Sequence, residues 1–403
     1  MDIRDEAMQL RNEKHQMIKT GLNAKMENSH DLAVVYTPGV AAPCLAIKEE
    51  EDKSLELTWR GNVVAVISDG TRVLGLGDIG PAAAMPVMEG KSALYKRFGN
   101  IDAIPIVLNT KDKDEIVRTI RILEKSFAGI NLEDFSSPKC YDIEDELKAT
   151  MNIPVFHDDQ HGTAIAALAA VLGALRLIKK GIGKAKVVMF GAGAAGTAIA
   201  RLLLEDGVKP ENMTVLNSKG ILYDDGRLNR VQKELAKKVN PENRQGTFAD
   251  AVKGADILLA TSAPAAFKEM HKEAIKTMAE KNVVFAMANP IPEMMLSDAQ
   301  ELGVYVFGTG RSDMPNQVNN SSVFPGLFRG PLDVRARQIN EPMKLAAAHA
   351  LADLVSDEEL KPEYVVVDVF DPRVPHAVAK ASAKVAIESG VARVTKLPEQ
   401  YKD

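Results

Sequence analysis

Short apolar segments alternate with helical ones along most of the chain. In the first 160 residues, apolar runs rich in β-branched residues predict strands, and helical spacing of apolar positions predicts the helices between them. The predicted strands are 62–67, 103–108, 129–132 and 154–157, and the predicted helices are 82–98, 113–127 and 141–150. Strands that are apolar throughout and separated by helices are typical of βαβ units in a mostly parallel sheet.

A second alternation of the same kind begins at Lys186. A long helix from His161 to just before Gly181 precedes it, and the C-terminal stretch 374–390 is also predicted to be helical. The strands predicted in this half are 187–190, 213–217, 256–260, 283–288 and 304–307. Two such series indicate an α/β fold with two domains.

Composition and charge narrow the class of protein. The chain has 403 residues, 46% of them apolar and 26% charged, which is typical of a globular protein and excludes a disordered one. A net charge of −5 without a basic stripe argues against a nucleic-acid partner. Two cysteines, Cys44 and Cys140, indicate a reducing compartment. The longest apolar run, 162–175, is shorter than the ~20 residues that span a bilayer, so we predict a buried helix, no membrane partner and a cytoplasmic location.

The strongest single motif is a glycine loop between a predicted strand and a predicted helix. The segment 186–196 reads KVVMFGAGAAG, in which Gly191, Gly193 and Gly196 form GxGxxG. The first glycine allows a tight turn, the second admits a pyrophosphate close to the backbone, and the third lets the helix pack on the strand. The helix N-terminus then offers free N–H groups to the phosphates. We therefore predict a Rossmann-type dinucleotide-binding domain with C-terminal helices at 159–403, after an N-terminal mostly parallel α/β domain at 1–158.

The end of the next strand bears on the choice of nucleotide. This fingerprint usually has an acid there, which binds the ribose hydroxyls and repels a 2′-phosphate. Here Asn217, Ser218 and Lys219 stand in that place without a carboxylate. Ser218 and Lys219 could bind a phosphate, or Lys219 could be a solvated turn residue while Asn217 still binds the ribose. The residues favour NADP⁺ used at least as well as NAD⁺.

Two acidic pairs follow predicted strands in the first domain. Glu133-Asp134 and Asp158-Asp159 lie where the carboxyl ends of parallel strands collect ligands. Converging carboxylates would repel one another unless a cation lay between them, and oxygen ligands suit Mg²⁺ or Mn²⁺. The same residues could instead be ordinary helix N-caps in solvated turns. His157 and His161 are better explained as structural residues than as ligands.

Two further side chains of the first domain could carry chemistry. Lys91 lies inside a predicted helix among small and apolar neighbours, so it is either a surface lysine or a desolvated amine whose pKa falls beside a cation. Tyr36 precedes a Thr-Pro-Gly turn that would fix its direction.

These motifs occur in one order along nearly the whole chain. The segments are VYTPGV, SDGTRVLGLGDIG, PVMEGKSALYKRFG, GINLEDF, PVFHDDQHGTA, FGAGAAG, FAMANP, GTGRSDMPNQVNN and FPGLFRGPLDVRA. Together they resemble malic enzymes of the short microbial type. The resemblance implies oxidative decarboxylation of (S)-malate to pyruvate and CO₂ with NADP⁺ or NAD⁺ and Mg²⁺ or Mn²⁺, decarboxylation of oxaloacetate, and a homodimer.

The resemblance also implies roles for individual residues. Glu133, Asp134 and Asp159 match metal ligands. Lys91 matches the general base, Tyr36 the general acid, and Asp158 a residue that supports the lysine. The residues that match substrate-binding groups are Arg72, Lys91, Asn289 and Asn320. The match at Arg72 is to the longer members of the family. Residues matching the nucleotide site are Gly191, Ala192, Gly193, Ala194, Ala195, Gly196, Asn217, Ser218, Lys219, Ser262 and Asn289.

Three other functions remain open. A malolactic enzyme shares these motifs but retains the nucleotide and releases lactate. Malolactic enzymes resemble the longer type of malic enzyme, so the length of this chain favours a malic enzyme. A catalytically silent malate or nucleotide sensor would not need Tyr36, Lys91 and the carboxylates together. An amino-acid dehydrogenase with a similar two-domain plan leaves the carboxylates unexplained.

Overall fold

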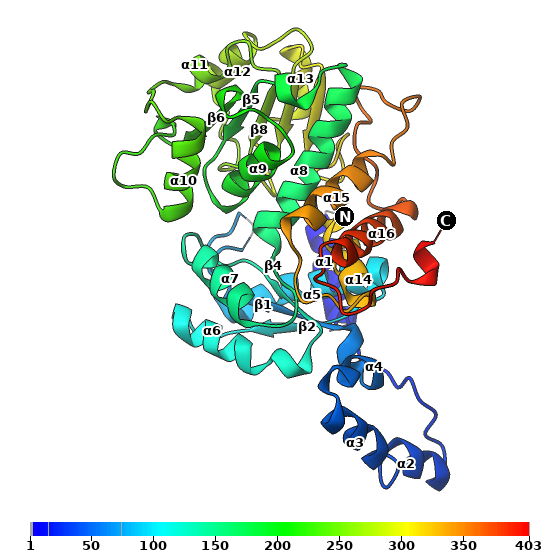
Figure 1. Ribbon diagram of the computed structural model, residues 1–403. Coiled ribbons are helices and arrows are strands. Elements are labelled where there is room, and N and C mark those ends of the chain that lie inside the picture. The colour runs from blue at the N-terminus through cyan, green and yellow to red at the C-terminus, as the bar shows by residue number, and fades with distance from the viewer. Residues whose placement is uncertain (1–2, 15, 74, 403) are drawn as a thin grey trace.

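The computed structural model describes residues 3–14, 16–73 and 75–402, and it contains two parallel sheets with helices packed on both faces. In Figure 1 the first sheet lies in the lower half of the molecule and the second in the upper half. The sheets confirm the predicted α/β class with two parallel systems in sequence order.

The first sheet has the strand order β2-β1-β3-β4 and is parallel throughout. Its strands and helices are β1 (Val63–Ser68), α5 (Pro81–Gly99), β2 (Asp102–Val107), α6 (Lys113–Ile122), β3 (Gly129–Leu132), α7 (Lys139–Thr150) and β4 (Val155–His157). Alternate residues of β1 face opposite cores: Val64 and Val66 pack with α5, whereas Val63, Ala65 and Ile67 pack with α6 and α7. This two-sided burial explains why the strand is apolar from Val63 to Ile67.

The second sheet has the strand order β10-β9-β8-β5-β6-β7. Its elements are β5 (Val187–Phe190), α9 (Ala194–Glu205), β6 (Met213–Asn217), β7 (Gly220–Ile221), α10 (Arg230–Val239), α11 (Phe248–Val252), β8 (Ile257–Ala260), α12 (Glu269–Ile275), β9 (Val283–Ala286), α13 (Leu296–Glu301) and β10 (Val306–Thr309). The five predicted strands are present within two residues at each end. The two-residue antiparallel β7 was not predicted, because its hairpin is too short to show a period.

Four long helices join the two sheets into one body. They are α8 (Asp158–Leu177), α14 (Phe324–Asp333), α15 (Glu341–Ala352) and α16 (Arg373–Glu388). One hydrophobic core runs through them from β1 to β5 and β9. By length and composition alone α8 could cross a bilayer, but 72% of that stretch is buried inside the protein. This burial confirms the predicted core helix, which begins at Asp158 rather than at His161.

The N-terminal elements are α1 (Ile3–Lys14), α2 (Ser29–Val35), α3 (Ala41–Glu49) and α4 (Ser54–Leu57). Figure 1 shows α2 and α3 projecting away from the rest of the molecule. No residue of α1, α2 or α3 is buried. We call residues 22–49 the arm.

Candidate active site

The carboxyl ends of β1, β3 and β4 meet at one edge of the first sheet. The strand order reverses direction between β1 and β3, and ligands of open α/β sheets collect at such a switch point. Glu133 and Asp134 directly follow β3, and Asp158 begins the helix that directly follows β4. The backbone N–H of Glu133 donates to the carbonyl of Ile67 in β1, which holds the turn against the sheet.

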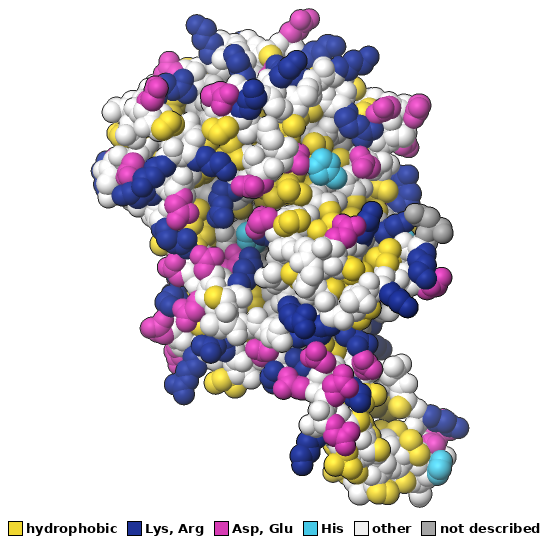
Figure 2. All heavy atoms as spheres, viewed as in Figure 1, with side chains coloured by type: hydrophobic (Ala, Val, Ile, Leu, Met, Phe, Trp, Pro, Cys, Tyr) yellow, Lys and Arg dark blue, Asp and Glu magenta, His cyan; other side chains and the backbone are white. Residues whose placement is uncertain are grey.

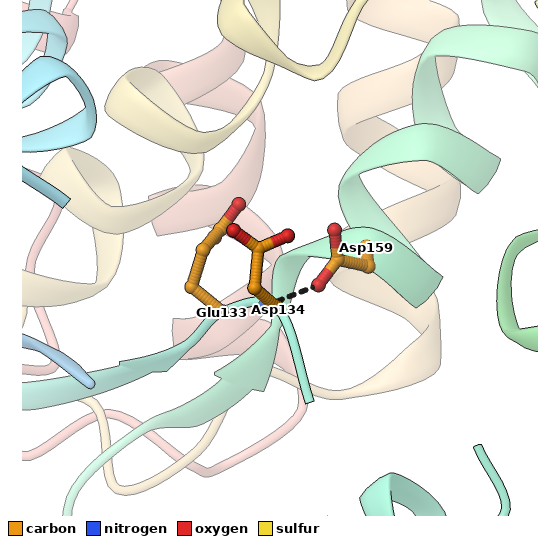
Figure 3. Close-up of side chains that lie close together, drawn as sticks. All are labelled: Glu133, Asp134 and Asp159. Atoms are coloured by element: carbon orange, nitrogen blue, oxygen red, sulfur yellow. Dashed lines mark hydrogen bonds between the residues drawn. The ribbon is translucent and has the colours of Figure 1, made fainter. Parts of the chain in front are cut away.

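Three of the four predicted carboxylates face one another. Glu133, Asp134 and Asp159 each place a carboxylate oxygen within 4.8 Å of the others (Figure 3). The backbone N–H of Asp134 donates to Asp159 Oδ2 at 2.8 Å, which joins the end of β3 to the first turn of α8. Asp158 is the exception, because its carboxylate turns toward Lys91.

The electrostatics of this cluster fit a divalent cation. Burial raises the pKa of Glu133 and the pKa of Asp159 above their ordinary values, and each group also feels another carboxylate nearby. A raised pKa means that the folded chain holds this negative charge at a cost, which a cation would offset. An all-oxygen donor set suits Mg²⁺ or Mn²⁺.

Lys91 is a buried residue and not a surface lysine. Its side chain is 7% exposed, and Nζ lies 2.9 Å from Glu133 Oε1, in contact with Asp158 Oδ2 and 4.4 Å from the ring centre of Phe324. Burial alone would lower the pKa of Lys91, but the carboxylates of Asp158 and Glu133 outweigh it and raise that pKa. The lowered pKa expected from the sequence therefore depends on a cation taking up the charge of Glu133.

The substrate residues inferred from the resemblance lie around this edge. The backbone N–H of Arg72 donates to the carbonyl of Asp134 at 2.9 Å, so the exposed side chain of Arg72 starts beside the cluster. The Asp158 carboxylate and Asn320 Cβ approach the same backbone atom, the Cα of Gly162. From the second domain, Asn289 lies against the backbone of Gly75. The site therefore lies between the two domains.

Tyr36 is not brought to this site within the chain. It ends α2 on the arm, its side chain is 65% exposed, and its hydroxyl makes no hydrogen bond to the part of the chain that the structure describes. The sequence pattern around Tyr36 did not show whether this side chain lies on the surface or beside the carboxylate cluster.

A hydrogen-bonded chain behind Glu133 was missed by sequence reasoning. The Tyr95 hydroxyl donates to Asn131 Oδ1 at 2.8 Å, and Asn131 Nδ2 donates to Glu133 Oε2 at 2.9 Å. Tyr95 lies four residues after Lys91 on α5, so the helical spacing was visible, but its partner on β3 was not. These bonds fix the orientation of one carboxylate of the cluster.

Neither His157 nor His161 belongs to the cluster of Glu133, Asp134 and Asp159. His161 Nε2 donates to Glu144 Oε2 (2.9 Å), His161 Nδ1 accepts from Lys344 Nζ (2.9 Å), and burial lowers the pKa of His161 to about 3. His157 is fully buried, with Nε2 3.6 Å from Asp159 Oδ2, and burial lowers its pKa also. The contacts of His161 agree with the structural reading of that residue.

Lys344 predicts a pH dependence of stability. It is 1% exposed, and burial, followed by repulsion from Lys148, lowers its pKa to about 8. Between pH 8 and 10 the unfolded chain therefore binds this proton more tightly than the folded chain, so the free energy of unfolding rises with pH. From pH 7.5 to 9.5 we expect wild type to gain about 2 kcal/mol relative to Lys344→Met, measured by urea denaturation. Parallel pH profiles of the two proteins would contradict this assignment.

The glycine loop has the geometry that a pyrophosphate site requires. Gly191 has a φ of 117°, where a side chain would be strained, and a Cβ on Gly196 would lie 1.8 Å from the carbonyl oxygen of Gly191. Open space surrounds the Cα of Gly193 at the start of α9. The loop follows β5 next to β8, where the strand order of the second sheet reverses.

The end of β6 carries a small cluster of charges. Asn217 Oδ1 accepts from the backbone N–H of Lys219 at 2.8 Å. Lys219 Nζ lies 3.4 Å from Asp225 Oδ2, which also accepts from Arg227 at 2.7 Å. Two cations around one anion leave this corner of the site with a net positive charge. Asp225 and Arg227 were missed because they come from the loop after β7.

Ser262 is held by a buried glutamate. The backbone N–H of Ser262 donates to Glu293 Oε1 at 2.5 Å, and the backbone N–H of Ala288 donates to Glu293 Oε2 at 3.0 Å. Glu293 thus ties together the segments that follow β8 and β9. This places Ser262 and Asn289 at neighbouring strand ends, on the same edge as the glycine loop.

Comparisons with known proteins agree with this geometry. A model described as malic enzyme, N-terminal domain, matches residues 12–148, and one described as malic enzyme, NAD binding domain, matches residues 160–393. The chain is 50% identical to the bifunctional malic/malolactic enzyme of Bacillus subtilis over 99% of this chain and 97% of that protein. It is 46% identical to the NADP-dependent malic enzyme of Escherichia coli, over 91% of this chain and 50% of that protein.

A solved structure shows the same architecture. The crystal structure of malic enzyme from Pyrococcus horikoshii superposes with a TM-score of 0.92 at 42% identity, covering 99% of this chain and 94% of the other.

Proposed function

The chain belongs to the malic enzyme family, and from that premise we propose that it oxidises (S)-malate to pyruvate and CO₂ while reducing NADP⁺ or NAD⁺. The observation that carries the proposal is Lys91, buried between Asp158 and Glu133 at the edge of a three-carboxylate cluster. An amino-acid dehydrogenase leaves the three carboxylates unexplained, and a catalytically silent sensor would not need a buried lysine beside them.

The cofactors would supply the electrophile and the oxidant. When bound at Glu133, Asp134 and Asp159, a divalent cation would acidify the malate hydroxyl and lower the pKa of neighbouring Lys91, and the oxidised nicotinamide would accept hydride from C2. The dinucleotide would lie on the loop from Gly191 to Gly196, with its pyrophosphate at the N-terminus of α9.

The chain's own residues would move the protons and hold the substrate. Lys91 Nζ accepts the C2 hydroxyl proton as hydride leaves C2, and Asp158 keeps that amine in place. The C4 carboxylate then leaves as CO₂, its bonding electrons form the enolate of pyruvate, and Tyr36 protonates C3. Arg72 can grip a carboxylate through two N–H groups, and hydrogen bonds from Asn289 and Asn320 add no charge.

A direct assay tests the proposal. Purified protein with (S)-malate and Mn²⁺ should form NADPH or NADH steadily, and pyruvate should appear in equal amount. Oxaloacetate supplied with Mn²⁺ and without nucleotide should also lose CO₂, because that step would need the cation at the carboxylate cluster and the acid but no hydride acceptor. Absence of nucleotide reduction with both NADP⁺ and NAD⁺ would contradict the proposed oxidation.

Malolactic activity is a second candidate, favoured by the similarity of this chain to the bifunctional malic/malolactic enzyme of Bacillus subtilis. That relative has nearly the length of this chain, so chain length does not separate the two activities as the sequence analysis expected. Lactate formed from malate with a catalytic amount of NAD⁺, and without release of NADH, would identify this activity.

The end of β6 predicts the nucleotide preference. Because Asn217 is uncharged and Lys219 and Arg227 outnumber Asp225, we expect NADP⁺ to be used at least as well as NAD⁺. Asn217→Asp should shift the kcat/KM ratio toward NAD⁺, since a carboxylate there repels a 2′-phosphate. A strong preference of the wild type for NAD⁺, unchanged by Asn217→Asp, would show that this strand end does not set the choice.

Tyr36 predicts a separate defect in the last step. Tyr36→Phe should impair protonation of the enolate and leave hydride transfer less affected. The measurement is deuterium exchange into the methyl group of pyruvate in heavy water. Normal exchange in Tyr36→Phe would remove this residue from the acid role.

The oligomeric state, the location and the domain boundaries are part of the same proposal. We propose a homodimer in the cytoplasm, in which residues 1–158 and 159–403 form the two domains. Cys44 and Cys140 are both free thiols, which supports a reducing compartment.

A further inference from the structure

A glutamate occupies a core position on α7. The buried residues of this helix form a stripe in which only the glutamate is charged: Cys140, Tyr141, Ile143, Glu144 and Leu147. Figure 2 shows acidic side chains spread over the surface of the molecule among basic ones, where water solvates them. Glu144, in contrast, is 3% exposed. A buried carboxylate destabilises the fold unless its oxygens are hydrogen-bonded, so its partners indicate what it does.

Three N–H donors and one ammonium group converge on the two oxygens of Glu144. Oε1 accepts from the backbone N–H of His157 at 3.1 Å, and Lys148 Nζ lies 2.6 Å from the same oxygen. Oε2 accepts from Gln160 Nε2 at 3.0 Å and from His161 Nε2 at 2.9 Å. Donors thus occupy both oxygens and leave no place for a proton, so Glu144 is a carboxylate.

Three of these partners belong to the start of α8. His157, Gln160 and His161 lie directly before and directly after the pair Asp158-Asp159, so Glu144 holds both sides of the turn that carries the two aspartates. His157 stands at the N-cap position, and its ring makes no hydrogen bond to the described part of the chain. The start of α8 is therefore fixed by a side chain of α7 rather than by a cap of its own.

The directions of the two aspartates depend on this turn. Asp159 accepts from the backbone N–H of Asp134 at 2.8 Å, whereas Asp158 contacts Lys91. Neighbouring side chains on a helix point about 100° apart, and both follow the backbone when it rotates. A small rotation of the first turn of α8 would therefore misplace both carboxylates at once.

The same turn is also held from α15. His161 Nδ1 accepts from Lys344 Nζ at 2.9 Å, and that amine pairs with Glu341 Oε1 at 2.7 Å. Lys344 is 1% exposed, on a helix that packs along α8. Both ring nitrogens of His161 are thus engaged, one by α7 and one by α15. A turn held from two helices has little freedom to rotate, as two divergent carboxylates require.

We propose that Glu144 is a positioning residue for the reaction. By fixing the first turn of α8, it directs Asp159 toward the carboxylate cluster and Asp158 toward Lys91. It acts through this turn and not on the reacting atoms. Groups that orient metal ligands from behind are a regular part of cation sites. The inference rests on the proposed function for the roles of Asp158 and Asp159.

Mn²⁺ affinity, measured by titration calorimetry without malate or nucleotide, tests the inference. Glu144→Gln keeps the size of the side chain but replaces one acceptor oxygen with an amide group, which then faces a donor. The turn has to shift, so we expect the affinity for Mn²⁺ to fall about 10- to 100-fold. Wild-type affinity in a folded Glu144→Gln protein would overturn the inference.

Two variants of the same helix separate positioning from stability. Leu147→Ala truncates a fully buried side chain three residues after Glu144, so it should lower the midpoint of thermal unfolding and leave the Mn²⁺ affinity of the folded protein unchanged. Glu146→Gln alters a glutamate that is 42% exposed beside Lys113, and it should change neither property. A loss of Mn²⁺ affinity in Leu147→Ala as large as that in Glu144→Gln would show that Glu144 only stabilises the fold.

Turnover at saturating Mn²⁺ gives a second signature. Glu144→Gln should recover CO₂ release from oxaloacetate more fully than malate oxidation, because only the oxidation also requires Asp158 to hold Lys91. A merely structural defect would lower both rates by the same factor, and that result would overturn the inference.

Gln160→Met is the milder variant, because it removes a single donor to Glu144. It should show the same pattern with smaller losses, and it carries the test if Glu144→Gln does not fold. Wild-type Mn²⁺ affinity in Gln160→Met would then count against the hold of Glu144 on the turn.

Cation binding and malate oxidation can fail separately. A wild type that binds Mn²⁺ without oxidising malate, together with weakened binding in Glu144→Gln, would reject the proposed function and keep the positioning of the cation ligands. An active wild type, together with a Glu144→Gln protein that binds Mn²⁺ equally well, would keep the proposed function and overturn this inference.

Discussion

Asp159→Asn is expected to abolish malate oxidation while the protein remains folded. The change removes one of three carboxylates that lie within 4.8 Å of one another, and with it one hard ligand and one balancing charge. The amide keeps the size of the side chain and can still accept from the backbone N–H of Asp134. We expect Mn²⁺ affinity, measured by titration calorimetry, to fall together with activity.

A second aspartate serves as the control for charge alone. Asp114 has an 83% exposed side chain at the start of α6 and pairs with Lys113. Asp114→Asn should leave both Mn²⁺ binding and turnover unchanged. Near-native activity of Asp159→Asn at low Mn²⁺ would exclude Asp159 as a ligand.

Lys91→Ala is expected to suppress hydride transfer by at least ~10²-fold, the usual contribution of a positioned base. The truncation removes the only amine in contact with both Asp158 and Glu133 among the residues described. The measurement is the rate of nucleotide reduction from malate, compared with the rate of CO₂ release from oxaloacetate. Malate oxidation should be lost more severely, because only that reaction requires the hydroxyl proton to be removed.

Loss of the lysine also leaves a buried carboxylate without its partner, which destabilises the fold. Lys91→Met keeps most of the apolar stem of the side chain but removes the ammonium group that lies over Phe324, so it separates lost packing from lost chemistry. Lys96→Ala, on the same helix but 54% exposed beside Asp102, is the matched control and should oxidise malate normally. A Lys91→Met protein that oxidises malate at the wild-type rate would exclude the amine as the base.

The carboxylate cluster could be predicted from the sequence because it depends on a general rule. Glu133-Asp134 and Asp158-Asp159 each follow a short, fully buried strand, and parallel strands end at one edge. The rule gives the neighbourhood but not the directions of the side chains. It could not show that Asp158 turns to Lys91 while Asp159 joins the other pair, since that choice depends on rotation within the first turn of α8.

Contacts between distant segments could not be predicted from the periodicity of the sequence. Tyr95 and Asn131 meet only because α5 packs across β1 and β2, so that the Tyr95 hydroxyl reaches β3, and Lys344 contacts His161 across more than 180 residues of chain. Periodicity describes one segment at a time, so it gives no information about such pairs. The projection of the arm was missed for a related reason: its apolar positions look like those of a core helix, and only the folded chain shows that nothing covers them.

The helix α8 has a consequence for exchanging parts between relatives. Its first turn supplies Asp158 and Asp159 to the site of the first domain, while its length packs against α9, the helix that follows the glycine loop. A chimera joined at residue 158 would take its cofactor loop and one of its three cation ligands from the same parent. Changing nucleotide preference by domain exchange would therefore also replace the segment that supplies one cation ligand. A junction placed after Leu177 keeps all three carboxylates from one parent and moves the mismatch to the packing of α8 on α9.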